Sequence, residues 1–173
     1  MGRALLLVDV LKDFDHEDGE RLLASFRERH AALALALEEA RSAGTPVVYA
    51  NDDAGGWDSD APALLRRARA GPGGDLVAAI APRPGDRVVL KPRYSAFDET
   101  PLGTILAELD VDELVLAGTA TEMCVFQTAT DALRRGHRVT VLADACATVD
   151  EENEALALAY LERIAGVRVG RRG

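Results

Sequence analysis

The sequence predicts an α/β protein, a three-layer α/β/α sandwich around a mainly parallel sheet of about six strands. Two observations carry this prediction. Short apolar runs rich in Val and Leu alternate along the chain with longer segments of helical periodicity, the order expected when helices connect parallel strands. The runs are continuous rather than alternating, which is typical of strands covered on both faces. The length of 173 residues predicts a single domain over residues 1–173.

Six short runs are the expected strands. They are LLLV (5–8), PVVYA (46–50), RVVLK (87–91), ELVLAG (113–118), RVTVLA (138–143) and the shorter VRV (167–169). Six segments between them are the expected helices, at residues 20–43, 61–70, 75–81, 101–109, 121–135 and 150–165. Local signals support these boundaries, because Gly44 and Gly136 follow two of the helices and Thr100 precedes Pro101 as an N-cap would. Right-handed crossovers are expected throughout.

Composition and charge exclude several classes of protein. The chain has 20 Lys and Arg against 29 Asp and Glu, a net charge of -9, which argues against a nucleic-acid or anionic-membrane partner. No apolar run reaches 18 residues, and the N-terminus is expected to carry no signal peptide. Two cysteines do not make a disulfide scaffold. We therefore expect a cytoplasmic protein with reduced thiols that acts on a small-molecule substrate.

Polar side chains follow the predicted strands at the point where each strand ends. Asp9 follows the first strand, Asn51 the second and Asp144 the fifth. Lys91 closes the third strand, and Cys124 comes shortly after the fourth. Ligands of open parallel sheets bind beyond the carboxyl ends of the strands, so an acid, a base and a thiol gather at one edge. Alone, each has an ordinary explanation as a turn residue, a solvated strand end or a buried filler; their coincidence favours a functional site.

Cys124 is the candidate nucleophile. With Thr121 as the N-cap, Cys124 is the third residue of the following helix, near free backbone N–H groups and the positive end of the helix dipole. That position is expected to lower the pKa of the thiol, while Lys91 favours the thiolate and Asp9 is able to take the proton. The same N–H groups can hold a developing oxyanion. Cys146 follows the fifth strand without a comparable helix start and is expected to be structural.

The three histidines are expected to be structural. His16 lies in a polar loop, His30 on the apolar stripe of a helix and His137 just before a strand. None of them follows a strand where a Cys-His pair would need it, and no two have the spacing of metal ligands. The first strand is followed by VLKDFDHEDG rather than by a glycine-rich phosphate loop. The sequence therefore predicts neither a metal nor a cofactor.

Four segments resemble those of a known family. LLLVDVLKDF, VVLKPRYSAFDETPL, GTATEMCVFQTATDA and VLADACAT occur in this order with matching spacing, and together they span almost the whole chain. The chain resembles the isochorismatase-like cysteine hydrolases, which include the nicotinamidases and N-carbamoylsarcosine amidohydrolase. The most specific part of the resemblance is the cysteine segment together with K-x-x-Y-S-A-F. It implies an isochorismatase-like fold of Rossmann-like topology.

The resemblance also implies how the site is built. It implies a catalytic triad of Asp9, Lys91 and Cys124, the same three residues that the strand ends single out. It further implies a non-proline cis peptide bond between Thr119 and Ala120, which turns the N–H groups of Ala120 and Cys124 toward the substrate oxygen as an oxyanion hole. Members of the family often form dimers or tetramers, so a homodimer or homotetramer is expected.

Three departures from the family narrow the prediction. Nicotinamidases of this family bind a metal through an Asp and His cluster after the second strand, whereas the segment NDDAGGWDSD (51–60) has no histidine. A metal-free subgroup is therefore expected. Isochorismatases proper lack the cysteine and cleave a vinyl ether by acid chemistry, a reaction that Cys124 argues against. The Gln that is common two residues after the first Asp is Leu11 here.

The expected reaction is hydrolysis of a C–N bond in a small amide, carbamoyl or imide-derived substrate, through a thioester on Cys124. Six further residues near the strand ends are candidates for the substrate pocket: Phe14, Asn51, Trp57, Tyr94, Phe97 and Glu122. Each also has a structural explanation. An aromatic side chain near a strand end belongs to the core at least as often as to a pocket, Asn51 suits a turn, and Glu122 suits the helix dipole.

Two alternative functions stay open at this point. A non-catalytic interaction protein with the same fold would have a closed pocket. A redox-sensing thiol protein would instead oxidise Cys124, with Cys146 as the resolving partner. That pairing requires the two α-carbons to lie within about 7 Å of each other.

Overall fold

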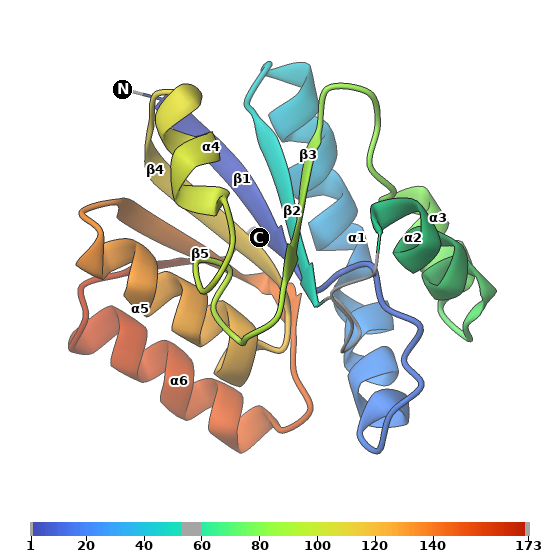
Figure 1. Cartoon of the computed structure of the whole chain (residues 1–173). Helices are drawn as coiled ribbons and strands as arrows, with labels where there is room; N and C mark the ends of the chain where they lie inside the picture. The colour runs from blue at the N-terminus through green and yellow to red at the C-terminus, as the bar shows by residue number, and fades with distance from the viewer. Residues whose placement is uncertain (1, 53–59, 172–173) are drawn as a thin grey trace.

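A six-stranded parallel sheet forms the centre of the molecule (Figure 1). The structure is a computed structural model that describes residues 2–52 and 60–171. Its strands are β1 (Gly2–Val8), β2 (Val47–Asp52), β3 (Arg87–Lys91), β4 (Val111–Thr119), β5 (Arg138–Ala147) and β6 (Arg168–Gly170). They lie in the order β3-β2-β1-β4-β5-β6, and each neighbouring pair is parallel. The predicted fold class is confirmed.

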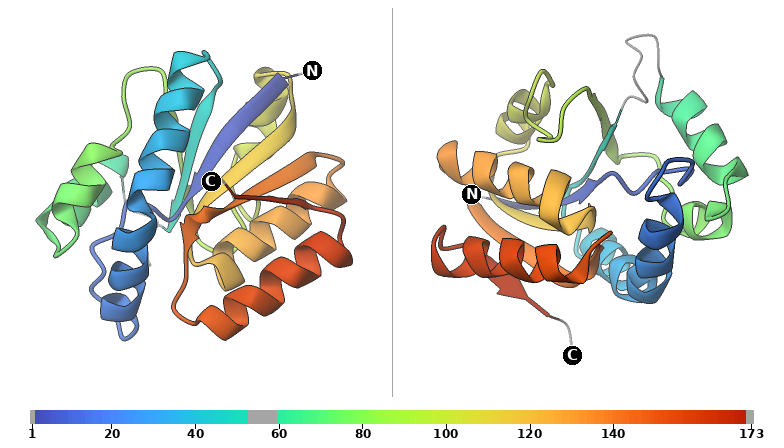
Figure 2. Two further views of the ribbon diagram at one scale, coloured as in Figure 1. Left: turned by 180° about the vertical axis from the view of Figure 1, so that it is seen from behind. Right: turned by 90° about the horizontal axis from the view of Figure 1, so that it is seen from below.

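Helices cover both faces of the sheet and complete the three layers (Figure 2). One face packs against α1 (Gly19–Ser42), α2 (Ala61–Ala70) and α3 (Gly74–Ala79), and the other against α4 (Leu102–Glu108), α5 (Phe126–Arg134) and α6 (Glu151–Arg163). A π-helical turn, η1 (Thr121–Val125), precedes α5. Within the described ranges, no helix is long and apolar enough to cross a membrane.

The continuous apolar run of β1 reflects its position inside the sheet. Leu5 and Leu7 point into the core beneath α1, while Leu6 and Val8 point into the core on the opposite face. All four side chains are buried. Because neighbouring side chains of a strand alternate between faces, every position of a strand that is buried on both faces points into a core and is apolar.

The winding of the chain reverses between β1 and β4. From β1 the chain adds β2 and then β3 toward one edge, whereas β4 returns to the other side of β1 and is followed outward by β5 and β6. A switch of this kind opens a crevice beyond the carboxyl ends of the two strands, and ligands of open α/β sheets bind there. Val8 pairs with Gly118 at that end of the sheet. The residues that follow them, Asp9 and Thr119, therefore stand together at the crevice.

Gly118 allows the close approach of β4 to β1. Its backbone has a φ of 136°, and a Cβ at this position would lie 2.0 Å from the carbonyl oxygen of Val8. Both the dihedral angle and the contact require glycine.

The largest difference from the predicted elements lies at residues 121–135. The sequence predicts one α-helix with Thr121 as its N-cap, but the structure divides the segment into η1 and α5. Ala120 occupies the cap position, and its carbonyl accepts a bond of 3.2 Å from the N–H of Val125, five residues later. The hydroxyl of Thr121 does not cap the helix; it donates to Glu154 of α6 at 2.7 Å and lies 3.2 Å from the carbonyl oxygen of Ala147.

Candidate active site

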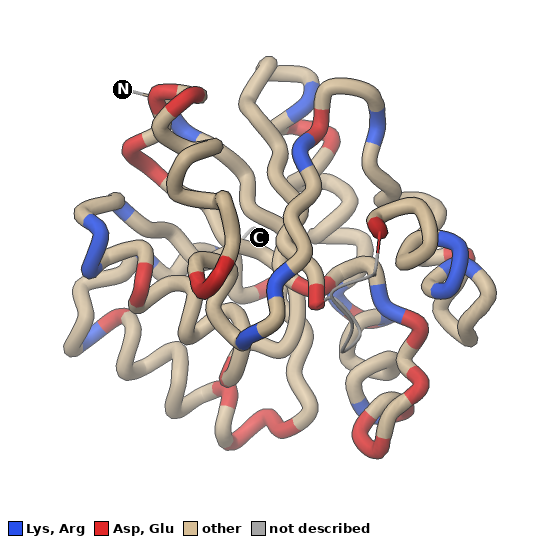
Figure 3. The backbone as a smooth tube through the Cα atoms, in the orientation of Figure 1, with Lys and Arg blue, Asp and Glu red and all other residues tan. Residues whose placement is uncertain are grey.

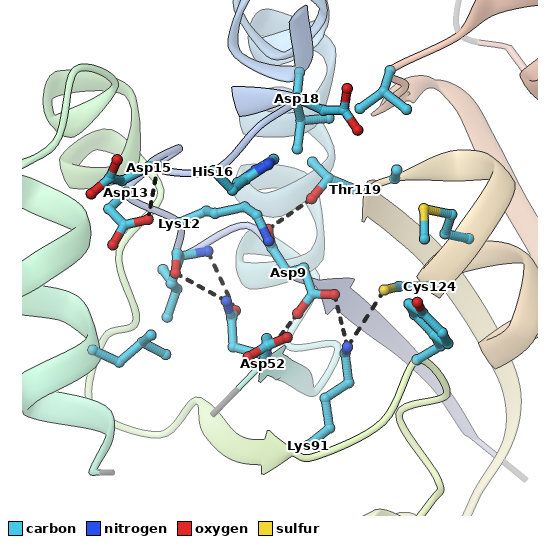
Figure 4. Close-up of a pocket in the computed structure, with 18 of the residues that line it drawn as sticks. Asp9, Lys12, Asp13, Asp15, His16, Asp18, Asp52, Lys91, Thr119 and Cys124 are labelled. Atoms are coloured by element: carbon cyan, nitrogen blue, oxygen red, sulfur yellow. Dashed lines mark hydrogen bonds and ion pairs between the residues drawn. The ribbon is translucent and has the colours of Figure 1, made fainter. Parts of the chain in front are cut away.

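Asp9, Lys91 and Cys124 meet at the carboxyl edge of the sheet, where the strand ends predict them (Figure 4). The Nζ atom of Lys91 lies 2.8 Å from Oδ2 of Asp9 and 3.5 Å from Sγ of Cys124. It also donates to the carbonyl of Arg93 at 3.0 Å. The Lys91 and Asp9 side chains are only 1% and 3% exposed, so each charge depends on the other for compensation. The ammonium bridges the carboxylate and the thiol.

Asp9 is held in place by backbone and side-chain bonds from the neighbouring strands. Its φ is 50°, in the left-handed region that non-glycine residues seldom adopt. The N–H of Asp9 donates to the carbonyl of Ala50 at 2.9 Å, and the hydroxyl of Thr119 donates to the carbonyl of Asp9 at 2.9 Å. The N–H of Asp52 donates to Oδ1 of Asp9 at 2.6 Å. With Oδ1 occupied in this way, Oδ2 faces Lys91 and the cavity.

The environment of Cys124 favours the neutral thiol. Burial raises the pKa of Cys124 to about 12; the charge of Asp9 adds to the rise and Lys91 opposes it. The expectation that the start of a helix lowers this pKa is therefore wrong, because burial and the Asp9 carboxylate outweigh the ammonium. The thiol and the Asp9 carboxylate both contact the ammonium of Lys91, at 3.5 Å and 2.8 Å. A base thus stands beside the thiol whose proton must leave.

Lys91 keeps its positive charge although it is buried. Burial acts to lower the pKa of Lys91, but the charge of Asp9 and its bond to the ammonium act against it, and the net result is a raised pKa. The ammonium is therefore available to stabilise negative charge on either neighbour.

The backbone before Cys124 corrects one expectation of the sequence. The peptide bond between Thr119 and Ala120 is trans, and no cis bond occurs within residues 2–52 or 60–171. The chain instead turns into η1 through Gly118 at a φ of 136° and through Ala120, whose φ of -80° and ψ of 145° are extended. Ala120 and Cys124 both line the cavity. The oxyanion hole expected from their N–H groups stays a prediction.

An open cavity of about 870 Å³ lies over the three residues. Much of its wall comes from the segment between β1 and α1, where acidic positions gather (Figure 3). The charged side chains that line it besides Asp9 and Lys91 are Lys12, Asp13, Asp15, Asp18, Asp52, Arg67 and Arg93. Arg67 and Asp13 pair across the cavity wall at 2.7 Å. This mixture of charges suits a polar substrate.

Two of the predicted pocket residues line the cavity. Tyr94 is half exposed at its edge. Asn51 is buried, and its amide bridges the backbone of Leu11, since Oδ1 accepts from the Leu11 N–H at 3.3 Å and Nδ2 donates to the Leu11 carbonyl at 3.0 Å. Asn51 therefore fixes the segment that leaves β1, as a turn residue would.

Three other predicted pocket residues point elsewhere. Phe14 packs against Phe26 in the core beneath α1, with ring centroids 5.4 Å apart. Phe97 lies in the opposite core and stacks on His137. Glu122 binds the hydroxyl of Thr148 and does not line the cavity among the described residues. Periodicity cannot separate a pocket aromatic from a core aromatic near a strand end. Trp57 lies outside the described residues.

Sequence reasoning missed several cavity residues that share one segment. Lys12, Asp13, Asp15, His16 and Asp18 all follow β1 and line the cavity. The signal was present in the charge density of KDFDHED directly after a strand, at the edge where ligands bind. Spacing of histidines alone made His16 look structural.

Two further features of the described residues concern a metal site and the environment of Cys146. No group of three His, Cys, Asp or Glu side chains in the described part of the chain is arranged to hold a metal ion. The segment after β2 also lacks a histidine donor, so the residues do not fit the metal cluster of nicotinamidases. Cys146 is fully buried, and burial raises its pKa to about 12. Both cysteines are free.

Comparison with known proteins assigns the family. Residues 3–170 match the Isochorismatase domain family. The chain belongs to the isochorismatase-like cysteine hydrolase family. It is 35% identical over 163 residues to the uncharacterized isochorismatase family protein YaaI of Bacillus subtilis (strain 168), an alignment that covers 94% of this chain and 90% of YaaI.

Two relatives of this family member carry named activities. Streptothricin hydrolase of Streptomyces noursei is 39% identical over 153 residues, which cover 86% of this chain and 55% of that protein. The chain thus spans about half the length of that relative. The crystal structure of N-carbamoylsarcosine amidase from Thermoplasma acidophilum superposes with a TM-score of 0.77 at 32% identity, covering 99% of this chain and 96% of that one.

Proposed function

We propose that this protein is a cysteine-dependent hydrolase that cleaves a C–N bond in a small amide, carbamoyl or imide-derived substrate. The observation that carries the proposal is the bridging position of Lys91 between Oδ2 of Asp9 and Sγ of Cys124 on the floor of an open cavity. A thiol and a carboxylate that both contact one fixed positive charge are the groups that acyl transfer requires.

In the first half of the reaction, Sγ of Cys124 forms a bond to the carbonyl carbon while its proton passes to Asp9. The raised pKa of the thiol makes this transfer simultaneous with attack, because little free thiolate exists at neutral pH. Negative charge on the substrate oxygen is held by the N–H groups of Ala120 and Cys124. The C–N bond then breaks, and the leaving nitrogen takes the proton from Asp9.

In the second half, water hydrolyses the thioester. Asp9 takes a proton from the water while the oxygen of the water bonds to the acyl carbon. The carbon–sulfur bond then breaks. The sulfur recovers the proton as the acid product leaves, so that the enzyme returns to its starting state. Lys91 keeps Asp9 oriented throughout and offsets the charge that passes between carboxylate and sulfur.

The relatives support the choice of bond. One is named as a hydrolase of streptothricin and another as an amidase of N-carbamoylsarcosine. The absence of histidine from residues 51–60 argues against a nicotinamidase metal cluster in this chain. The polar cavity also favours a substrate with several hydrogen-bonding groups over a flat apolar ring.

A screen of amides with matched cysteine variants tests the proposal. The purified protein, Cys124→Ala and Cys146→Ala are incubated with N-carbamoylsarcosine, nicotinamide, streptothricin and a panel of primary amides and ureas. Ammonia release and the addition of one water are followed by enzymatic assay and mass spectrometry. We expect turnover of at least one compound, a loss of at least roughly 1000-fold in Cys124→Ala, and near-parental activity in Cys146→Ala. Equal activity in the two variants would contradict the proposed nucleophile.

A further inference from the structure

The turn that carries Cys124 is hydrogen-bonded to an ion pair between α1 and α6. Thr121, the first residue of η1, donates from its hydroxyl to Oε1 of Glu154 in α6 at 2.7 Å. Glu154 in turn accepts two bonds from Arg29 of α1, at 2.6 Å through Oε1 and 2.9 Å through Oε2. This arrangement is a bidentate guanidinium–carboxylate pair, the geometry that fixes orientation best.

The ion pair lies where all three layers of the fold meet. Thr121 and Glu154 are buried, and the Arg29 side chain is 22% exposed. Arg29 also donates to the carbonyl of Cys146, near the end of β5, at 2.6 Å. Arg29 of α1 thus binds Glu154 of α6 past the carboxyl end of β5, and η1 is bonded to the same carboxylate.

A second set of bonds holds the same turn through the neighbouring residue. Glu122 accepts from the hydroxyl of Thr148 at 2.8 Å and from the N–H of Val149 at 3.1 Å. The N–H of Thr148 donates to the hydroxyl of Ser25 at 3.1 Å. Ser25 and Arg29 are four residues apart and so share one face of α1. Both sets of bonds therefore end on the same face of that helix.

We infer that Arg29, Glu154 and Thr121 are positioning residues for the nucleophile: their bonds hold η1 in the π-helical form that places Cys124 against Asp9 and Lys91. The inference rests on the proposed function, in which Cys124 attacks and Asp9 takes its proton. None of the three residues lines the described cavity over the triad, so they act through Cys124 and not on substrate.

The π-helical form of η1 explains why these hydrogen bonds are needed. A π-helical turn is rarer and less favourable than an α-helical one and persists where surrounding contacts impose it. The hydroxyl of Thr121 bonds Glu154 and also lies 3.2 Å from the carbonyl oxygen of Ala147 in β5. Its removal would release η1 from α6 and β5 and allow the segment to wind as the ordinary α-helix that the sequence alone predicts. Rewinding of η1 would move Cys124 relative to Lys91, which stands only 3.5 Å from the sulfur.

A pair of substitutions at Thr121 tests the inference without a substrate. Thr121→Val keeps the shape of the side chain but removes the hydroxyl, and Thr121→Ser restores it. Alkylation of Cys124 by iodoacetamide is followed by peptide mass spectrometry across pH. We expect Thr121→Val to slow alkylation at neutral pH roughly tenfold, since displacement of a reacting group by about 1 Å costs up to about 100-fold. Thr121→Ser should return the rate to within about threefold of the parent.

The pH profile distinguishes positioning from loss of general stability. When Asp9 takes the proton, the rate hardly depends on pH near neutrality; when Cys124 is separated from Asp9, it rises with pH because only free thiolate reacts. Thr121→Val should therefore convert a flat profile into a rising one. An unchanged flat profile and a rate within about twofold of the parent, or a faster one, would overturn the inference.

A second buried ion pair on α1 supplies the matched control. Arg41 of α1 binds Asp86 at 2.6 Å with similarly low exposure, and the other bonds of Arg41 reach the hydroxyl of Tyr49 and the carbonyl of Ala81. Glu154→Gln and Asp86→Asn each remove one carboxylate charge from an arginine of the same helix. The inference requires that only Glu154→Gln slows alkylation at neutral pH and makes its rate rise with pH. Equal effects of the two variants, or none from either, would show that these pairs serve stability alone; Thr121→Val decides the question if Glu154→Gln fails to fold.

Failure of this inference is separable from failure of the proposed function. If Cys124 of the parent protein alkylates no faster than a buried ordinary thiol and Cys124→Ala hydrolyses as well as the parent, the proposed function is wrong. If the parent is reactive and Thr121→Val matches it, only the positioning role is wrong.

Discussion

At Cys124, burial and two neighbouring charges act in different directions on the pKa of the thiol. Burial and Asp9 raise the pKa of the thiol to about 12, against the pull of Lys91. At neutral pH the proton therefore stays on sulfur until an acceptor takes it. Asp9, which contacts the same Lys91 ammonium as the thiol, is that acceptor in the proposed reaction. Reactivity then comes from proton transfer within the site and not from a standing thiolate.

Replacing Asp9 changes how the reactivity of Cys124 depends on pH. In the parent, transfer of the proton to Asp9 involves no exchange with solvent, so the alkylation rate should be nearly constant between about pH 6 and about pH 9. In Asp9→Asn only thiolate formed by loss of a proton to solvent reacts, so the rate should rise roughly tenfold per pH unit below the pKa of the thiol. Iodoacetamide labelling measured by mass spectrometry checks both profiles; a rising profile in the parent would contradict the role of Asp9 as base.

The three central residues could be predicted because topology places them. Asp9, Lys91 and Cys124 each follow a strand, and parallel strands end at one edge. The direction of the thiol pKa could not be predicted, because it depends on burial, which is decided by packing around η1. Phe14 and Phe97 were misplaced for the same reason: a side chain near a strand end turns toward cavity or core according to its neighbours in space.

At the scale of elements, the site depends on how closely β4 approaches β1. Gly118 brings the backbone of β4 against the carbonyl of Val8 and then leads directly into η1. The strand positions were predictable from continuous apolar runs. The π-helical form of η1 was not, since its sequence suits an α-helix and the deciding bonds of Thr121 and Glu122 reach residues more than twenty positions away.

Two glycine substitutions should have opposite effects. Gly118→Ala places a Cβ 2.0 Å from the carbonyl oxygen of Val8 at a φ of 136°, so we expect the free energy of unfolding to fall by at least about 3 kcal/mol. Gly103 lies in α4 with open space around its Cα, and Gly103→Ala should raise it by about 0.5–1 kcal/mol. Urea titration measures both. A Gly118→Ala protein as stable as the parent would mean that β4 does not approach β1 this closely.

At the scale of the whole molecule, the sheet separates two cores and buries thiols in a low-dielectric interior. Cys146 lies wholly inside, and burial raises its pKa to about 12. The unfolded chain ionises the same thiol near its ordinary value of about 8.5. A group whose pKa is raised by folding supports stability fully below its unfolded pKa, and that support is lost as pH rises through the folded pKa.

The expected homodimer or homotetramer stays a prediction.

Alkaline pH should therefore destabilise the protein in a way that depends on Cys146. Between about pH 9 and about pH 11, each such thiol lowers the free energy of unfolding by up to about 1.4 kcal/mol per pH unit. We expect Cys146→Ala to start slightly less stable and to lose roughly 2 kcal/mol less than the parent over this range. Urea denaturation in the presence of a reductant measures the difference. Parallel pH dependences for the two proteins would show that Cys146 ionises as readily in the folded as in the unfolded state.

The most direct test of the proposed chemistry is to look for the acyl group on Cys124 during turnover. The protein is mixed with the best amide from the screen, and the reaction is quenched with acid within milliseconds to seconds. The mass of the peptide that contains Cys124 is then measured by mass spectrometry. The proposed reaction predicts a mass increase equal to the acyl group on that peptide. It also predicts that Cys124→Ala shows no such increase and no turnover. An unmodified Cys124 peptide, together with hydrolysis by Cys124→Ala at the parental rate, would contradict it.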